Sequence, residues 1–267
     1  MVEEEEATKY RVFFVRTGQS DISNSRHLSG WCDAFLSQQG IQEAHEASQE
    51  LINSGYNVFD VVFTSTLSRA RKFAQILLRD LHLESITTYH SWRLNERHHG
   101  WLTGFKSKDT ACKYGVEQSV HWYLSKGQIP KITKNHEYYA NIAQTSKEYK
   151  IPEHRIPLSE TIESCAKRIL PYWDSFIGPM IRANKRVLIV VHEHAFRGFV
   201  KLLQNMNERE ISLIRLPSAT IPIYYDVNED LVAFNEMTFI CNNDKKQAWL
   251  ASRWENRSRH IAELNLT

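Results

Sequence analysis

The sequence predicts an α/β fold with three layers, in which a mostly parallel sheet carries helices on both of its faces. The prediction depends on three short apolar runs, at residues 10–15, 58–63 and 186–191, each followed by a pattern typical of a helix. Strands that alternate with helices favour parallel pairing, because a helix is the usual connection between parallel strands. The chain has 267 residues, 42% of them hydrophobic, which is enough to build a sizeable core.

The amino-terminal part supplies three of the expected strands. In chain order we expect a strand at 10–15, a helix at 37–54, a strand at 58–63, a helix through 67–78 and a short strand at 87–90. Both helices have apolar residues at helical spacing. Ser37 can cap the first helix, and the hydroxyls of Thr64 and Ser65 can cap the second, because such side chains accept hydrogen bonds from free backbone N–H groups.

A segment of looser pattern, at about 97–157, separates this part from the carboxyl-terminal part. It contains three prolines and a polar, aromatic-rich stretch at 121–123, so we expect an insertion with short helices. Beyond it the sequence predicts a helix at 161–181, a strand at 186–191, a helix at 192–205, a strand at 221–225 and a candidate edge strand at 231–239. Pro171 should kink or break the first of these helices, because proline lacks a backbone N–H.

Composition and segment boundaries limit the class of protein. Residues 9–240 are expected to form one domain, between a disordered acidic lead at 1–8 and a partly helical tail at 241–267. No apolar run approaches the ~18 residues of a membrane span, and the lead lacks the features of a signal peptide. The net charge of +2 gives no drive toward nucleic acid. Four dispersed cysteines without a CxxC pair suggest reduced thiols. We therefore expect a cytoplasmic protein without a metal, a nucleic-acid partner or a membrane contact.

Polar residues follow three of the predicted strands, where ligands bind in parallel sheets. They are Arg16-Thr17-Gly18, Thr64-Ser65 leading to Arg69, and His192-Glu193-His194. An arginine after a buried strand suits a phosphate or a carboxylate, although a structural ion pair for Arg16 is equally consistent with the sequence. A ligand site at this edge of the sheet is the prediction.

The other candidates each have a structural alternative. The position of Arg69 by itself favours an arginine on the surface of a helix. His192 is suited to donate a proton or bind phosphate, but a buried structural histidine would fit the sequence as well. Glu96 lies among two arginines and two histidines, where it could act as a general acid or base or be held in a salt bridge. No single residue decides the function.

Taken together, these segments resemble one family. The segments Arg16-Thr17-Gly18 with Ser29-Gly30-Trp31, and residues 92–98, Trp-Arg-Leu-Asn-Glu-Arg-His, are similar to the cofactor-dependent phosphoglycerate mutases of the histidine phosphatase superfamily. So are Thr64-Ser65 with Arg69-Ala70, and the run 185–189 leading to His192. The resemblance covers residues 9–237.

The resemblance implies a mechanism without a metal. In that family a histidine after the first arginine takes a phosphoryl group from 2,3-bisphosphoglycerate and passes it to a phosphoglycerate, a second histidine and two arginines cradle the phosphate, and a glutamate moves protons. Arg16, Arg69, Glu96 and His192 match those positions. By the same resemblance the phosphate-binding positions also include Ser23, Ser29, Gly30 and residue 193.

Several positions depart from the family pattern. Thr17 stands where the nucleophilic histidine is expected, and a hydroxyl is a far weaker nucleophile without a strong base. Glu193 replaces a glycine, and Ser23 replaces an asparagine. An arginine pair after a tryptophan is replaced by Tyr123 and Leu124. These changes lie at the predicted ligand-contacting tips, whereas the strands and helices keep their pattern.

Two functions follow as expectations. The first is an inactive mutase-like protein, a pseudoenzyme that retains part of a phosphate-binding pocket for a phosphorylated small molecule. The second is an active glycolytic mutase that interconverts 2- and 3-phosphoglycerate, or a phosphatase, with rewired chemistry, in which 2,3-bisphosphoglycerate is the donor. The replacement nucleophiles considered are His27, His98, His99 and His194. By resemblance we also expect a homodimer, or a heterodimer with a mutase-like subunit, through residues 57–63 and 87–92.

Overall fold

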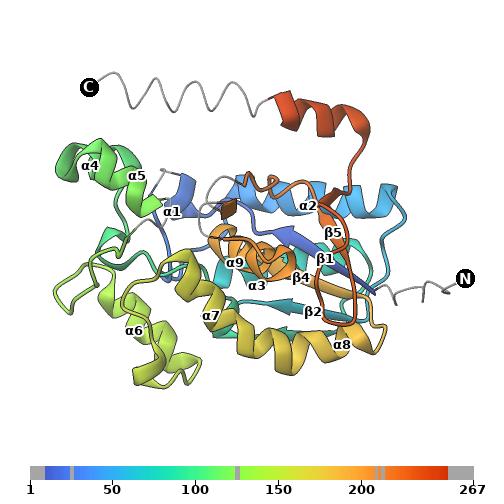
Figure 1. Cartoon of the computed structure of the whole chain (residues 1–267), viewed down its shortest axis with the longest axis horizontal. Coiled ribbons are helices and arrows are strands. Elements are labelled where there is room, and N and C mark those ends of the chain that lie inside the picture. Colours follow the sequence, from blue (N-terminus) through green and yellow to red (C-terminus); the bar gives the residue numbers. More distant parts are fainter. Residues whose placement is uncertain (1–9, 25–26, 124–126, 208–209, 212–213, 252–267) are drawn as a thin grey trace, which may run out of the picture.

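The computed structural model describes residues 10–24, 27–123, 127–207, 210–211 and 214–251. Its centre is a six-stranded sheet with the order β3-β2-β4-β1-β5-β6 (Figure 1). The strands are β1 (Tyr10–Arg16), β2 (Val61–Thr64), β3 (Thr87–His90), β4 (Val187–Val191), β5 (Ile223–Val227) and β6 (Thr238–Phe239). Strands β1 to β4 are parallel, whereas β5 is antiparallel to β1 and β6 is antiparallel to β5. The prediction of a mostly parallel sheet is therefore confirmed.

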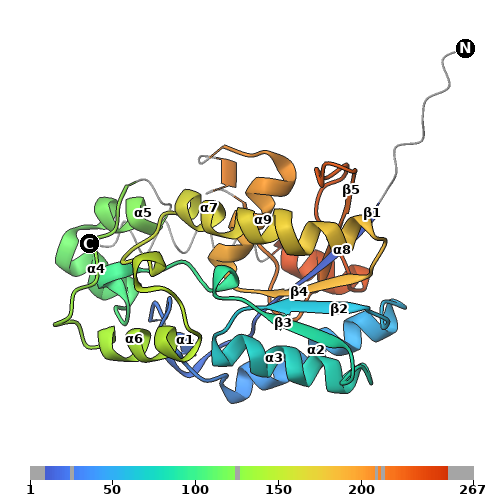
Figure 2. The ribbon, with the colours of Figure 1, turned by 90° about the horizontal axis from the view of Figure 1, so that it is seen from below.

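Helices cover both faces of this sheet, which confirms the three layers (Figure 2). On one face lie α2 (Gln38–Asn53) and α3 (Ser68–Asp80), and on the other lie α7 (Ile162–Tyr172), α8 (Gly178–Arg182) and α9 (Glu193–Gln204). Alternate residues of the strands enter the two cores: Phe14 packs on the α7 and α9 side, and Phe13 packs on the α2 and α3 side. Burying both faces explains why the central strands read as continuous apolar runs.

In its described residues the insertion contains three short α-helices. They are α4 (Ser107–Tyr114), α5 (Val116–Tyr123) and α6 (Tyr139–Glu148), and they lie beyond the carboxyl ends of the parallel strands (Figure 1). The other short elements are α1 (Asp21–Asn24) and the 3₁₀ turns Trp92–Leu94, Gly100–Leu102 and Glu153–Arg155. Two small apolar clusters, around Trp31 and around Trp122, attach the insertion to the rest of the chain.

Three predicted details are wrong. The hydroxyls of Thr64 and Ser65 do not cap α3, whose N-cap is Leu67 without a side-chain hydrogen bond. Strand β2 runs to Thr64, so its hydroxyl donates to the Val190 carbonyl at 3.1 Å, while the Ser65 hydroxyl accepts from the Leu67 N–H. Strand β2 begins at 61 rather than 58, and within 231–239 only Thr238–Phe239 form a strand.

The helix expected at 161–181 is divided near its proline. Helix α7 ends at Tyr172, a wide π-helical turn spans Trp173–Ile177, and α8 follows. The cause is Pro171, which can neither donate a hydrogen bond nor leave room for the carbonyl four residues before it. Thr161 caps α7 through a reciprocal capping box with Ser164.

The predicted terminal segments lie only partly within the described residues, whereas the segments of the predicted subunit contact are described in full. Residues 1–8, most of the tail and Leu124 lie outside the described residues; of the tail, 243–251 are helical, and Lys245 pairs with Glu50 of α2 at 2.9 Å. Strand β2 lies inside the sheet with 61–63 buried, so this part of the expected contact cannot meet another subunit. Strand β3, at the edge, can. Of the helices in the described ranges, none is long and apolar enough to cross a bilayer.

Candidate functional site

The sheet brings three of the predicted site residues together at the carboxyl ends of β1, β2 and β4. Strand β1 pairs with β4 as far as Arg16 opposite Val191. The Thr17 N–H then donates to the Val191 carbonyl at 2.8 Å. This bond fixes Thr17 beside His192, which begins the connection to α9, and Ser65 closes the group from the end of β2.

His192 links the other two side chains. Its Nδ1 lies 3.4 Å from the Thr17 hydroxyl, and its Nε2 lies 2.7 Å from the Ser65 hydroxyl. Burial, together with the charge of Arg69, lowers the pKa of His192 to about 3. The imidazole is therefore neutral at pH 7, and one nitrogen donates while the other accepts. His192 is thus buried and bonded within the structure, and it also contacts Thr17; a role in proton donation or phosphate binding stays a prediction.

Arg69 is buried rather than exposed on α3, so the interpretation favoured by its position alone is wrong. Its side chain leaves the first turn of α3 and donates to the Cys32 carbonyl at 2.9 Å and to the Gly30 carbonyl at 2.8 Å. Its positive charge helps to lower the pKa of His192 and attracts the Glu96 carboxylate. Two of its five donors are thus spent on the 30–32 loop, which holds the guanidinium in place beside the site.

The backbone conformation and the close neighbours of residue 30 favour glycine at this position. Its φ of 49° lies in the left-handed region, and a Cβ there would approach the His99 ring to 3.1 Å. The carbonyl that Arg69 uses therefore comes from a turn that only glycine forms without strain. Ser29, half-buried in the same turn, accepts the Cys32 N–H through its carbonyl. The residue pair predicted at 29–30 thus positions Arg69 through the backbone.

Glu96 caps a helix. Its Oε1 accepts from the backbone N–H groups of Arg97 at 2.7 Å, His194 at 3.0 Å and Ala195 at 3.3 Å. The last two belong to the first turn of α9, where a carboxylate is favoured. Burial opposes the charge, but His194 and the fields of His192 and His99 set the pKa of Glu96 well below its ordinary value. The carboxylate is ionised and carries no proton to donate at neutral pH.

Arg16 already faces an anion, and the anion is Glu193. The Arg16 Nη1 lies 3.3 Å from the Glu193 Oε2, and the Arg197 Nη2 lies 3.9 Å from its Oε1. The Arg16 and Glu193 side chains are 28% and 34% exposed, whereas Thr17 is only 9% exposed. This ion pair is therefore more accessible to solvent than Thr17.

An ion pair that the sequence reasoning missed holds the 92–98 segment. Arg168 on α7 binds Glu160 through two bonds of 2.6 Å and 2.9 Å. It also donates to four backbone carbonyls, those of Trp92, Arg93, Asn95 and Glu96. Glu160 in turn accepts the His98 N–H at 2.9 Å. The available signal was an arginine three residues after Cys165, one of the buried residues of α7, and directly before another, Ile169.

The remaining candidates make contacts of their own. Ser23 in α1 bonds only locally, to Ser20 at 2.8 Å. His98, His99 and His194 are buried, and the last two rings lie 5.1 Å apart. Tyr123, which replaces a family arginine, lies with its ring 5.9 Å from that of His194. Within the described ranges no group of three His, Cys, Asp or Glu side chains could hold a metal.

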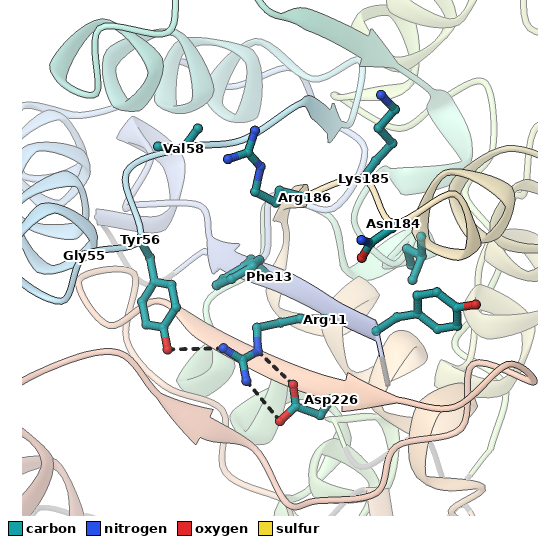
Figure 3. Close-up of a pocket in the computed structure, with 11 residues that line it drawn as sticks. Arg11, Phe13, Gly55, Tyr56, Val58, Asn184, Lys185, Arg186 and Asp226 are labelled. Atoms are coloured by element: carbon teal, nitrogen blue, oxygen red, sulfur yellow. Dashed lines mark hydrogen bonds and ion pairs between the residues drawn. The ribbon is translucent and has the colours of Figure 1, made fainter. Parts of the chain in front are cut away.

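A separate pocket of about 460 Å³ lies at the opposite, amino end of β1 (Figure 3). Arg11 occupies its centre, where it binds Asp226 at 2.7 Å and the Tyr56 hydroxyl at 3.3 Å. Arg186 on its rim is paired with Asp60 at 2.7 Å. Both arginines are paired with carboxylates of the chain itself, and the pocket lies at the end of β1 opposite to Thr17.

Comparison with known proteins bears on the fold. Residues 12–131 match the histidine phosphatase superfamily (branch 1). The structure is similar to the α-ribazole phosphatase from Shigella flexneri, with 18% identity and a TM-score of 0.60 over 86% of this chain and 97% of that one. A mycobacterial glucosyl-3-phosphoglycerate phosphatase gives 16% identity and 0.61 over 81% and 92%.

A mutase has the same fold. The phosphoglycerate mutase from Bacillus anthracis shares 15% identity and a TM-score of 0.58, over 87% of this chain and 94% of that one. At these identities the likeness shows the fold, and phosphatases and a mutase share it alike. The match to the model of the histidine phosphatase superfamily, branch 1, thus covers residues 12–131, less than half of the chain, and the fold is the one that these phosphatases and the mutase share.

Proposed function

We propose that this protein is a non-catalytic member of the phosphoglycerate mutase-like group, a pseudoenzyme that keeps part of an anion pocket. One observation carries the proposal: Thr17 occupies the nucleophile position, and the one base in contact with it is His192, with a pKa of about 3. A hydroxyl nucleophile needs a base whose pKa is near the working pH. His192 would take the proton poorly, so attack on phosphorus is slow.

The residue at the proton-donor position is also poorly suited to donate a proton. The family glutamate position is Glu96, whose carboxylate is ionised and bound to three backbone N–H groups. A group that must give and take protons during turnover should lie near neutrality. Together with the missing nucleophile, whose loss typically lowers the rate by about 10⁴ to 10⁶, this supports an inactive or severely impaired protein.

The ligand class we propose is a phosphorylated small molecule. Arg16, Arg69 and Arg197 lie around the strand ends, and guanidinium groups suit phosphate and carboxylate. The similar structures described above include two phosphatases and a mutase named for phosphate-containing substrates. The protein needs no further cofactor in this role; 2,3-bisphosphoglycerate would be the phosphoryl donor only if it were active.

An active mutase or phosphatase with rewired chemistry is the second candidate, and the contact between Thr17 and His192 favours it. If His192 bonds Ser65 through its Nε2–H, its Nδ1 can accept the Thr17 proton. The Thr17 oxygen would then bond to phosphorus as the donor's ester oxygen leaves with a proton. A relocated phosphohistidine is less supported, because His98, His99 and His194 are all buried; His27 is half-buried.

A single labelling experiment separates these functions. The protein is incubated with ³²P-labelled 2,3-bisphosphoglycerate and the trapped label is tested for acid stability, with mutase turnover measured in parallel. We expect neither label nor turnover. Acid-stable label that disappears in Thr17→Val would establish the threonine chemistry instead. Acid-labile label with normal turnover would show a relocated histidine and end the pseudoenzyme proposal.

We also propose a cytoplasmic dimer, homomeric or with a mutase-like subunit. The support is strand β3, the outermost strand, of which Thr87, Tyr89 and His90 are exposed. An unpaired strand edge is a template for pairing with another chain. Sedimentation of the purified protein should show a dimer that Thr88→Pro converts to a monomer. A monomer in both cases would remove the homodimer.

A further inference from the structure

The anion-binding end of the sheet already contains a carboxylate from the chain itself. Glu193 is the first residue of α9, and its two oxygens are directed to two different guanidinium groups, Arg16 at 3.3 Å and Arg197 at 3.9 Å. Arg16 comes from the end of β1 and Arg197 from the next turn of α9. The carboxylate therefore bridges two elements, in the manner of a bound anion.

The surroundings of Glu193 are those of an anion site. Arg197 is 8% exposed and is held by hydrogen bonds to the Ile211 and Ile214 carbonyls. The other titratable groups close to Glu193 are Tyr123, His194 and Glu96, of which Glu96 is a second carboxylate that opposes negative charge here. The first turn of a helix also favours negative charge. Of the three arginines near the strand ends, Glu193 pairs with Arg16 and Arg197, whereas Arg69 donates to backbone carbonyls.

The ion pair between Arg16 and Glu193 is strong enough to affect anion affinity, but a ligand can still displace it. The Arg16 and Glu193 side chains are about one-third exposed, and pairs of this kind contribute a factor of about five in an equilibrium constant. A free phosphate entering between the two arginines would additionally meet the charge of the carboxylate it displaces. The cost of breaking the ion pair and the charge repulsion both lower the affinity of the site for anions, but they do not prevent binding.

We propose that Glu193 is the specificity-determining residue of this site: its carboxylate occupies the place of a ligand's anionic group between Arg16 and Arg197, and a phosphate or carboxylate ligand binds only by displacing it. The inference rests on the proposed function, in which this edge of the sheet is an anion pocket. It follows that Glu193 occupies the anion site in the ligand-free protein. A ligand that binds there must therefore make contacts beyond those of a single phosphate.

The test is isothermal titration with inorganic phosphate and, separately, with 3-phosphoglycerate. Glu193→Gln removes the charge and keeps the shape of the side chain, and we expect phosphate to bind at least about tenfold more tightly than to the unmodified protein. The matched control is Glu163→Gln, because Glu163 is also about one-third exposed and paired to two cations, Lys167 and Lys201, outside the site. It should leave phosphate affinity unchanged.

The outcomes distinguish this inference from the proposed function. If Arg16→Met weakens phosphate binding but Glu193→Gln does not strengthen it, the site binds anions and the role of Glu193 is refuted. If the folded Glu193→Gln protein binds neither probe, both the inference and the anion pocket fail. Glu193→Ala, which removes the same carboxylate with a different side chain, must give the same direction of change as Glu193→Gln, and the opposite direction would overturn the inference.

Discussion

Mild acid should destabilise this fold, because two buried histidines cannot accept a proton in the folded state. Burial, together with nearby positive charge, lowers the pKa of His98 and of His192 from 6.5 to about 3. In the unfolded chain both rings titrate near 6.5. Above pH 6.5 each ring is neutral in both the folded and the unfolded chain, so it does not affect the free energy of unfolding. As the pH falls from 6.5 toward 3, only the unfolded chain binds the proton, and the free energy of unfolding decreases.

The size of the effect follows from proton linkage. A ring that is protonated only when unfolded lowers the free energy of unfolding by about 1.4 kcal/mol between pH 7.5 and 5.5, so the two rings account for about 3 kcal/mol. Domains have about 5–15 kcal/mol in total. The lowered pKa of Glu96 also removes stability on acidification, but only below its unfolded value of 4.5. Between pH 7.5 and 5.5 the change in the free energy of unfolding therefore comes from histidines. His99 and His194, whose pKa values are also lowered by burial, change it in the same direction.

The measurement is urea unfolding, followed by tryptophan fluorescence at pH 7.5, 6.5 and 5.5. His98→Asn and His192→Asn should each remove about 1.4 kcal/mol from the difference between pH 7.5 and 5.5, whatever they cost at a single pH. His154→Asn, at an exposed position, is the control and should leave the difference unchanged. A free energy of unfolding that is constant from pH 7.5 to 5.5 would show that the buried rings accept protons, and would refute the reasoning.

Three further predictions concern single residues. Thr17→His should not restore mutase turnover, because the Arg16 ion pair still fills the site; recovery to a normal rate in the mutase assay would contradict this. Arg168→Met should lower the free energy of unfolding in urea by about 3–5 kcal/mol, because it strands a buried carboxylate, whereas Lys167→Met on the exposed side should change it by less than about 0.5. Gly30→Ala should cost about 2–4 kcal/mol, from backbone strain plus the close ring contact. Gly55→Ala, with positive φ but open space around it, should cost only about 1–2; equal costs would show that the contact is relieved.

The strands and the edge that carries the site could be predicted because they depend on local sequence. Buried parallel strands read as apolar runs, and the residues after such runs meet at one edge of the sheet. That places Arg16, Thr17 and His192 together, as the structure has them. Their contacts were not predictable to the same degree, because the partners of each side chain come from distant segments.

Arg69 and Glu96 illustrate the limit. A helix arginine is exposed by default, and Arg69 is buried because two carbonyls more than thirty residues away accept its hydrogen bonds. Glu96 was expected either to move protons or to be held in a salt bridge, whereas its main partners are backbone N–H groups of α9, 98 and 99 residues later in the chain. Backbone donors leave no mark in the sequence, because every residue except proline has one.

Thr17 and Glu193 belong to one electrostatic arrangement. A phosphorylated histidine at position 17 would bring up to two negative charges toward the Glu193 carboxylate, and like charges at such range disfavour each other. Conversely, without a phosphate the cations Arg16 and Arg197 would face each other across the strand ends, and the carboxylate between them relieves that repulsion. Thr17 and Glu193 are therefore compatible with each other. A glutamate at position 193 fits the proposed function, in which residue 17 carries no phosphoryl group, and the two residues together support that proposal more than either one alone.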